Sequence, residues 1–167
     1  MKIIFLDIDG VLNSNAFFAS NDSAVKKLYQ NTKYSSDDIN FLVKRQMMDI
    51  DCNKLNLLKS VIDETGAKVV LTSSWKRLRI YPYIAIKLND LGIPIIDCTI
   101  DNGNDRGTGI KQYLFEHQVD NYVILDDDIF DDYDDELMRK LVKTSFYNDG
   151  LQEKHKVELI KRLKKQH

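Results

Sequence analysis

The stretch that decides the fold is residues 2–13, KIIFLDIDGVLN. It begins with the apolar run Lys2–Leu6 and then changes abruptly to carboxylates, with Asp7 and Asp9 two positions apart. A nearly continuous apolar run is typical of a parallel strand that is covered on both faces. The carboxylates therefore follow directly on a buried strand, and Gly10 allows the chain to turn sharply after them.

Apolar strands continue to alternate with helical patterns along the chain. We expect further strands over Lys68–Leu71 and over residues 93–96, 122–125 and 141–146. The alternation predicts an α/β fold with a doubly wound, mainly parallel, Rossmann-like sheet and helices on both faces. The inward faces predicted for the intervening helices are Leu55, Leu58 and Ile62; Ile84, Leu88 and Leu91; Ile110, Leu114 and His117; and Val157, Ile160 and Leu163.

Residues 13–50 interrupt this alternation, because the segment is too long for a simple loop and too polar for two core elements. We predict one helix that begins near the capping residues 35–37. Its apolar face is Ile39, Val43, Met47 and Ile50. We interpret the segment as a small insertion, a flap or minimal cap, beside the first strand's carboxyl end. Residues 1–167 are then a single domain without a large cap domain.

The composition is that of a globular protein. The chain has 167 residues, a formal net charge of −2, 43% hydrophobic and 30% charged residues, which excludes a disordered, collagen-like or membrane chain. The early apolar run is too short for a signal sequence or a transmembrane helix. The distant Cys52 and Cys98 predict buried free thiols in a reducing compartment. We therefore expect a cytoplasmic protein with no membrane contact, and we favour a monomer.

Polar residues follow three of the predicted strands, and ligands bind at the carboxyl edge of open α/β sheets. Such clustered carboxylates are costly unless a cation neutralises them, and hard oxygen ligands indicate Mg²⁺. The first strand is followed by the carboxylates already named. The other two are followed by Thr72, Ser73 and Ser74, and by Asp126, Asp127 and Asp128.

Three motifs in this order carry a resemblance to a known family: Asp7-x-Asp9-Gly10-Val11, Thr72-Ser73-Ser74 and Asp126-Asp127. Together they resemble the haloacid dehalogenase (HAD) superfamily of phosphotransferases. The finer patterns LTSSW at 71–75, RGxxI at 106–110 and VILDD at 123–127 are similar to the HAD domain of Swiss Army Knife RNA-repair proteins. The resemblance covers nearly the whole chain and is vaguest over residues 13–50. It implies a Mg²⁺-dependent phosphomonoester hydrolase.

The resemblance also implies roles for the carboxylates. Asp7 would be the nucleophile that forms a phosphoaspartyl intermediate, because an acyl phosphate is reactive enough for water to open again. Asp9 would be the general acid and then the general base. Asp7 and Asp126 would ligate Mg²⁺ together with the backbone carbonyl of Asp9, and Asp127 would ligate it directly or through water.

The remaining implied roles concern the phosphate. Thr72 would donate a hydrogen bond to a phosphoryl oxygen, with Ser73 and Ser74 as alternatives, and Gly10, Ser73 and Lys76 would bind the substrate. The family usually places a Lys beside the nucleophile. Here Arg106 matches that position, and its planar guanidinium can supply the same positive charge through bidentate hydrogen bonds. Lys76 and Lys111 compete for this role.

The substrate is the least defined part of the hypothesis. A site without a large cap is open and suits a bulky phosphorylated substrate, which slightly favours a nucleic-acid or nucleotide phosphate end. Aromatic residues are not enriched in residues 13–50, so base stacking is not supported there. A small-metabolite phosphatase of the same mechanism and a non-catalytic, receiver-like phosphoaspartate signalling domain are the alternatives.

Overall fold

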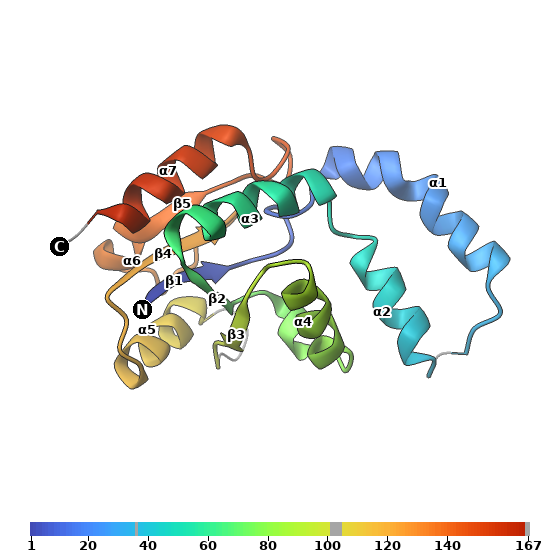
Figure 1. Cartoon of the computed structure of the whole chain (residues 1–167), viewed down its shortest axis with the longest axis horizontal. Coiled ribbons are helices and arrows are strands. Elements are labelled where there is room, and N and C mark those ends of the chain that lie inside the picture. Colours follow the sequence, from blue (N-terminus) through green and yellow to red (C-terminus); the bar gives the residue numbers. More distant parts are fainter. Residues whose placement is uncertain (36, 101–104, 166–167) are drawn as a thin grey trace.

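The computed structural model describes residues 1–35, 37–100 and 105–165. Within them, five strands form one parallel sheet in the order β3-β2-β1-β4-β5 (Figure 1). The strands are β1 Lys2–Leu6, β2 Lys68–Leu71, β3 Ile95–Cys98, β4 Asn121–Asp126 and β5 Leu141–Lys143. The α/β prediction is confirmed. Because β1 is central, the residues after it have a strand end on each side.

The strand predictions differ from the structure mainly at the sheet edges. Residues 2–6 and 68–71 are confirmed as predicted, and β4 extends one residue further at each end than predicted. The strand predicted over 93–96 begins two residues later, at Ile95. Pro94 has no N–H to donate, and its carbonyl accepts a hydrogen bond from Val69 N at 3.0 Å. The strand predicted over 141–146 ends at Lys143, where the chain enters a tight hydrogen-bonded loop.

The helices cover both faces of the sheet, as predicted. The face that carries Ile4 and Leu6 packs against α3 Cys52–Thr65, α4 Tyr81–Asp90 and α7 Glu153–Lys164. The face that carries Ile3 and Phe5 packs against α5 Arg106–Glu116 and α6 Asp135–Lys140. A short 3₁₀ helix, η1 Ser74–Arg77, follows β2. The buried strand residues thus form two apolar layers that hold the strand ends in place.

The predicted inward faces are mostly confirmed. Leu55, Leu58 and Ile62 are buried on α3, which ends at Gly66 in the left-handed conformation. The predicted burial is wrong for two residues. Leu91 is the residue after α4 and is 47% exposed, and Val157 is 61% exposed because α7 turns His155, Leu159 and Leu163 inward. Cys52 and Cys98 are free thiols, but Cys52 is exposed and Cys98 only partly buried, so the expected burial is wrong.

The insertion is a pair of helices, α1 Asn15–Asn31 and α2 Ile39–Met47, which we call the helical hairpin. It extends away from the packed layers (Figure 1). The predicted helix is α2; Asp38 caps it, and Ser36 of the expected capping segment lies outside the described residues. The sequence patterns did not predict α1, because Leu28 is its one buried residue among those described.

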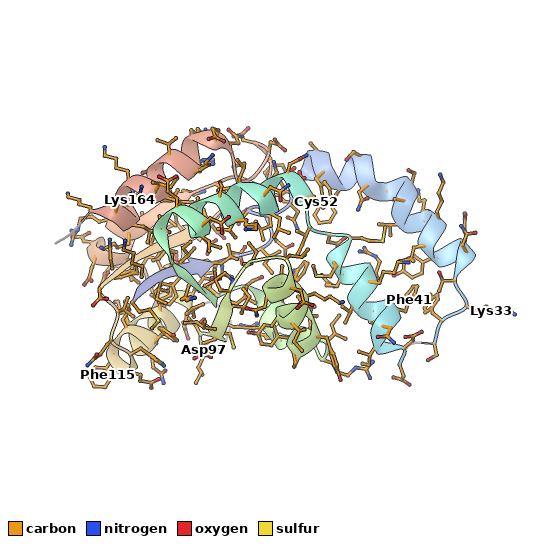
Figure 2. All side chains as sticks on the ribbon, in the orientation of Figure 1. Lys33, Phe41, Cys52, Asp97, Phe115 and Lys164 are labelled. Carbon is orange, nitrogen blue, oxygen red and sulfur yellow. The ribbon has the colours of Figure 1, made fainter. Side chains whose placement is uncertain are left out.

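The two hairpin helices are joined by aromatic side chains. Phe41, labelled on α2 in Figure 2, stacks on Tyr34 with ring centroids 4.1 Å apart. It also meets Tyr29 of α1 edge to face. The hairpin also leaves and rejoins the domain at one place, since Asp51 N donates to Leu12 O at 2.8 Å. The insertion is therefore a closed side structure on the sheet domain.

Candidate active site

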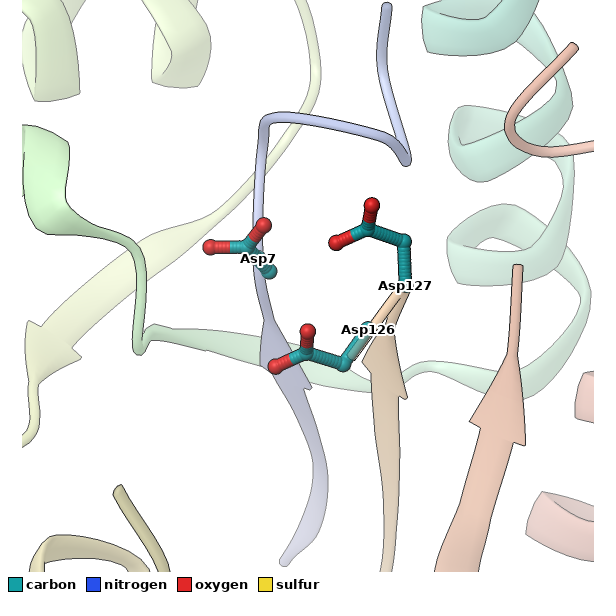
Figure 3. Close-up of side chains that lie close together, drawn as sticks. All are labelled: Asp7, Asp126 and Asp127. Carbon is teal, nitrogen blue, oxygen red and sulfur yellow. The ribbon is translucent and has the colours of Figure 1, made fainter. Parts of the chain in front are cut away.

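Three carboxylates meet where β1 and β4 end (Figure 3). The parallel register places Leu6 opposite Leu125, so that Asp7 follows β1 directly beside Asp126. Asp7, Asp126 and Asp127 each offer an oxygen within 4.8 Å of the others, and we call them the carboxylate triad. Asp7 and Asp126 are buried and Asp127 is half-buried.

Burial and mutual repulsion make the triad resist ionisation. Burial raises the pKa of Asp7 to about 7; the charges of Asp126, Asp9 and Asp127 add to this shift, and Arg106 opposes it. Burial also raises the pKa of Asp126, although the positive charge of Arg106 lowers it. Burial raises the pKa of Asp127 as well. Three acidic groups with raised pKa values in one cleft are the arrangement expected of a functional site.

Arg106 lies between two members of the triad. Its Nη1 is 3.1 Å from Asp7 Oδ1 and 2.5 Å from Asp126 Oδ2, and its guanidinium covers the Phe130 ring at 4.3 Å from the ring centroid. Arg106 is the first residue of α5. The carboxylate of Asp132 accepts hydrogen bonds from the first backbone N–H groups of this helix and so fixes its start. Of the three candidate cations, the structure brings Arg106 to the triad.

The other two candidate cations have partners elsewhere. Lys76 Nζ donates to Thr99 Oγ1 at 2.9 Å and to the backbone carbonyl of Thr72 at 3.3 Å, which directs it toward the end of β3. Lys111 forms a solvent-exposed ion pair with Asp134 at 2.8 Å. Among the described residues, no hydrogen bond or ion pair joins either ammonium to the triad.

Asp9 is held by two side chains that the sequence patterns did not indicate. Asn13 Nδ2 donates to Asp9 Oδ1 at 2.8 Å, and Trp75 Nε1 donates to Asp9 Oδ2 at 3.1 Å. Asn13 also donates to the carbonyl of Asp49 at 3.1 Å, which ties the end of the helical hairpin to the same group. A buried indole N–H needs a hydrogen-bond acceptor. The acceptor, Asp9, lies 66 residues before Trp75, so the sequence pattern did not identify it.

The three hydroxyls after β2 have different surroundings. Thr72 lies beside Asp7, since its N–H donates to Leu6 O at 2.9 Å, and its Oγ1 is buried without a hydrogen-bond partner among the described residues. Ser73 caps η1, and its Oγ accepts from Trp75 N at 3.4 Å. Ser74 lines the cleft that contains the triad. Of these three hydroxyls, that of Thr72 is the one that is buried with no hydrogen-bond partner among the described residues.

The chain matches the family described as the HAD domain in Swiss Army Knife RNA repair proteins, over residues 3–156. It belongs to that family. The resemblance noted from the three motifs is confirmed, and with it a hydrolase of the HAD superfamily, a HAD-type phosphatase at that level. Searches among curated proteins and among solved structures found no match. Among the residues that the structure describes, no helix is long and apolar enough to cross a membrane.

The donor set of this HAD domain fits a divalent cation. Carboxylate oxygens are the ligands that Mg²⁺ prefers. The elevated pKa of Asp7 reflects buried negative charge that a cation would offset. Asp7, Asp126 and Asp127 could therefore hold a metal ion.

Gly10 shapes the loop beside the triad. Its φ is +74°, and a Cβ built on it would lie 2.1 Å from Asp127 Oδ2, so a side chain here would displace that carboxylate. Its N–H donates to Asn13 Oδ1 at 2.9 Å, and its carbonyl accepts from Thr144 Oγ1 at 2.7 Å. Both backbone groups of Gly10 are therefore hydrogen-bonded within the protein, and the residue shapes the loop beside the triad. Its contact with substrate stays a prediction.

The triad lies in a cleft of about 380 Å³. Three aromatic residues, Phe130, Phe146 and Tyr147, line it beside the carboxylates. They come from the segments after β4 and β5, and the sequence patterns did not point to them. The further lining residues are Asp7, Asp9, Ser74, Arg106 and Asp126 to Asp128.

Proposed function

We propose that this HAD domain is a Mg²⁺-dependent phosphomonoester hydrolase that works through a phosphoaspartyl intermediate on Asp7. The observation that carries the proposal is the close approach of Asp7, Asp126 and Asp127 at one sheet edge. Arg106 adds a fixed positive charge beside the nucleophile, 3.1 Å from Asp7 Oδ1. A carboxylate nucleophile with a cation and a second acid nearby is an arrangement that suits phosphoryl transfer through a phosphoaspartate.

The proposed reaction has two steps. In the first, a carboxylate oxygen of Asp7 attacks phosphorus, the bond from phosphorus to the ester oxygen breaks, and Asp9 gives its proton to the leaving alcohol. In the second, Asp9 takes a proton from a water molecule that attacks the phosphoaspartate. Inorganic phosphate leaves, and the carboxylate of Asp7 is restored. Asn13 and Trp75 support this role of Asp9, because they hold its carboxylate in one orientation.

The proposed metal ligands are the carboxylate triad and the backbone carbonyl of Asp9. When bound, Mg²⁺ supplies positive charge that offsets the repulsion between a phosphate dianion and the carboxylates. Thr72 would donate its unpartnered hydroxyl to a phosphoryl oxygen. Arg106 would keep Asp7 ionised and oriented in the same cleft.

For the substrate we propose a phosphate at the end of a nucleic acid or on a nucleotide. The family description, which names RNA repair proteins, supports this class. So does the open cleft, because its lining residues among those described come from the end of β4, from the segments that follow β1, β2, β4 and β5 and from the start of α5, and not from a large cap. A small-metabolite phosphatase with the same two steps is the alternative.

The mechanism is tested by phosphate release from p-nitrophenyl phosphate. We expect turnover with Mg²⁺, loss of turnover with EDTA, and recovery when Mg²⁺ is added back. Asp7→Asn should abolish turnover, whereas Asp90→Asn, at an exposed position at the end of α4, should not change it. Full activity of Asp7→Asn would refute the mechanism. A phosphoprotein that persists for hours without turnover would point instead to the receiver-like alternative.

The substrate class is tested by a panel under the same conditions. It compares oligonucleotides phosphorylated at the 3′ or the 5′ end, mononucleotides and sugar phosphates by kcat/KM. The proposal expects the nucleic-acid or nucleotide substrates to rank first. A preference for sugar phosphates would support the metabolite phosphatase instead.

A further inference from the structure

Two aromatic side chains from the loop after β5 reach the cleft that contains the carboxylate triad. Phe146 and Tyr147 line this cleft together with Asp7 and Asp127. Tyr147 is 83% exposed, so core packing does not account for its position. A phosphate bound at Asp7 would therefore have aromatic surface close by.

The backbone of this loop is fixed relative to the triad. Thr144, two residues before Phe146, donates from its N–H to Asp126 O at 2.9 Å and from Oγ1 to Gly10 O at 2.7 Å, and the carbonyl of Phe146 accepts from Asn15 N at 3.0 Å. The loop is closed by Gly150 N, which donates to Ser145 O at 2.8 Å. The two aromatic residues thus have a defined position beside a proposed metal ligand, without any need for the loop to order on binding.

The rings themselves support each other. The Tyr147 ring stands nearly perpendicular to that of Phe146, with centroids 5.3 Å apart and an interplanar angle of 87°. Phe146 in turn packs on Phe18 of α1, with centroids 5.9 Å apart. Tyr147 is therefore buttressed by a partly buried ring while most of its own surface is open to solvent. A supported, open aromatic ring is what a nucleobase stacks on.

We propose that Phe146 and Tyr147 form a base-stacking subsite for the nucleoside that carries the scissile phosphate, with Tyr147 as the ring that the base contacts. The inference deepens the proposed function and rests on it for the position of the phosphate. It selects phosphate esters of nucleosides over sugar phosphates, which have no aromatic ring to stack. The stacking surface comes from the loop after β5 and not from residues 13–50, where the sequence gives base stacking no support; Phe18 of that segment acts only as a brace.

The test compares two substrates in matched variants. For adenosine 5′-monophosphate, Tyr147→Ala should lower kcat/KM about 5- to 150-fold, the range for the loss of one base–aromatic stack. Ribose 5-phosphate should be hydrolysed as before. Tyr147→Phe should match the wild type on both, because stacking needs the ring and not the hydroxyl. The control is Phe115→Ala, at a 92% exposed position on α5 (Figure 2). Equal losses on both substrates, or no loss on either, would overturn the subsite.

A binding measurement separates this inference from the proposed function. Calorimetry gives the affinity of adenosine 5′-monophosphate for Asp7→Asn with and without Tyr147→Ala, and it needs no turnover. Weaker binding in the double variant supports the subsite even if no phosphatase activity is found. Equal binding refutes the subsite even if phosphatase activity is confirmed. Repeating the comparison with a 5′-phosphorylated oligoadenylate shows whether the base belongs to a free nucleotide or to a strand end.

Discussion

Replacement of Asp7 by Asn should stabilise the metal-free protein at pH 8 and remove much of its pH dependence. Burial, with the charge of Asp126 next in size, raises the pKa of Asp7 from 3.8 to about 7 in the folded protein. Between these two values the folded state keeps a proton that the unfolded chain has released. Stability therefore falls as the pH rises through this window, and the full cost is present above the folded pKa.

The size of the effect follows from the shift. A change from 3.8 to about 7 corresponds to a destabilisation on the order of 4 kcal/mol once Asp7 is ionised. Asn has nearly the same shape and carries no charge, so it avoids this cost, while Arg106 keeps its contact with Asp126. For a chain of this size, 4 kcal/mol corresponds to roughly 8–16 °C in Tm.

The assay is thermal unfolding followed by circular dichroism at pH 5, 6, 7 and 8 in EDTA. Asp7→Asn should already have a modestly higher Tm than the wild type at pH 5, which lies about one unit inside the window, and the difference should grow to its full size at pH 8. Asp90→Asn serves as the control for loss of an exposed carboxylate. Adding Mg²⁺ should raise the wild-type Tm more at pH 8 than at pH 5, because the ligands must be deprotonated to bind the ion.

Two results would contradict this reasoning. A metal-free wild type whose Tm is the same at pH 5 and pH 8 would mean that Asp7 is not held in a costly ionised state. An Asp7→Asn variant with an unchanged slope of Tm against pH would mean that the pH dependence arises from other groups.

Three further outcomes are expected. Trp75→Phe removes the N–H donor to Asp9 but keeps most of the packing, so kcat should fall about 10- to 100-fold with little change in KM, as steady-state kinetics will show. Gly10→Ala pushes a Cβ into Asp127, so calorimetry should find Mg²⁺ affinity at least about 10-fold weaker; unchanged affinity would count against Asp127 as a ligand. Arg106→Gln leaves its two buried carboxylate partners without their cation, so denaturant unfolding should show a loss of about 3–5 kcal/mol at pH 8 and a smaller loss at pH 5, where they take up protons.

The limits of a strand were predictable where an apolar run gives way abruptly to polar residues. Lys2–Leu6 is followed by a carboxylate and Lys68–Leu71 by hydroxyls, and both strands have the predicted limits. Pro94 shows the opposite case, because an apolar run alone does not reveal where the backbone can pair. The helix α1 was not predictable from a buried face, since its contacts are made by a few aromatic residues with distant partners.

The core of the site was predictable because strand ends in a parallel sheet share one edge. That rule brings Asp7, Asp9 and residues 126–128 to one edge, and the resemblance to the HAD superfamily then selects Asp7, Asp126 and Asp127 as metal ligands. The resemblance favoured Arg106 among three nearby cations, but the sequence did not exclude Lys76 or Lys111, because the outcome depends on which acceptor each side chain reaches in space. The same holds for the contact between Trp75 and Asp9, which joins residues 66 positions apart and leaves no periodic signal.

The hydrogen bond from Asp51 N to Leu12 O gives the insertion a modular character. Because the polypeptide departs and returns at adjacent backbone positions, the span between them can change in length while the strand order stays the same. The residues at its base set the limit, since Asn13 holds Asp9, and Asn15 and Phe18 contact Phe146 beside the cleft.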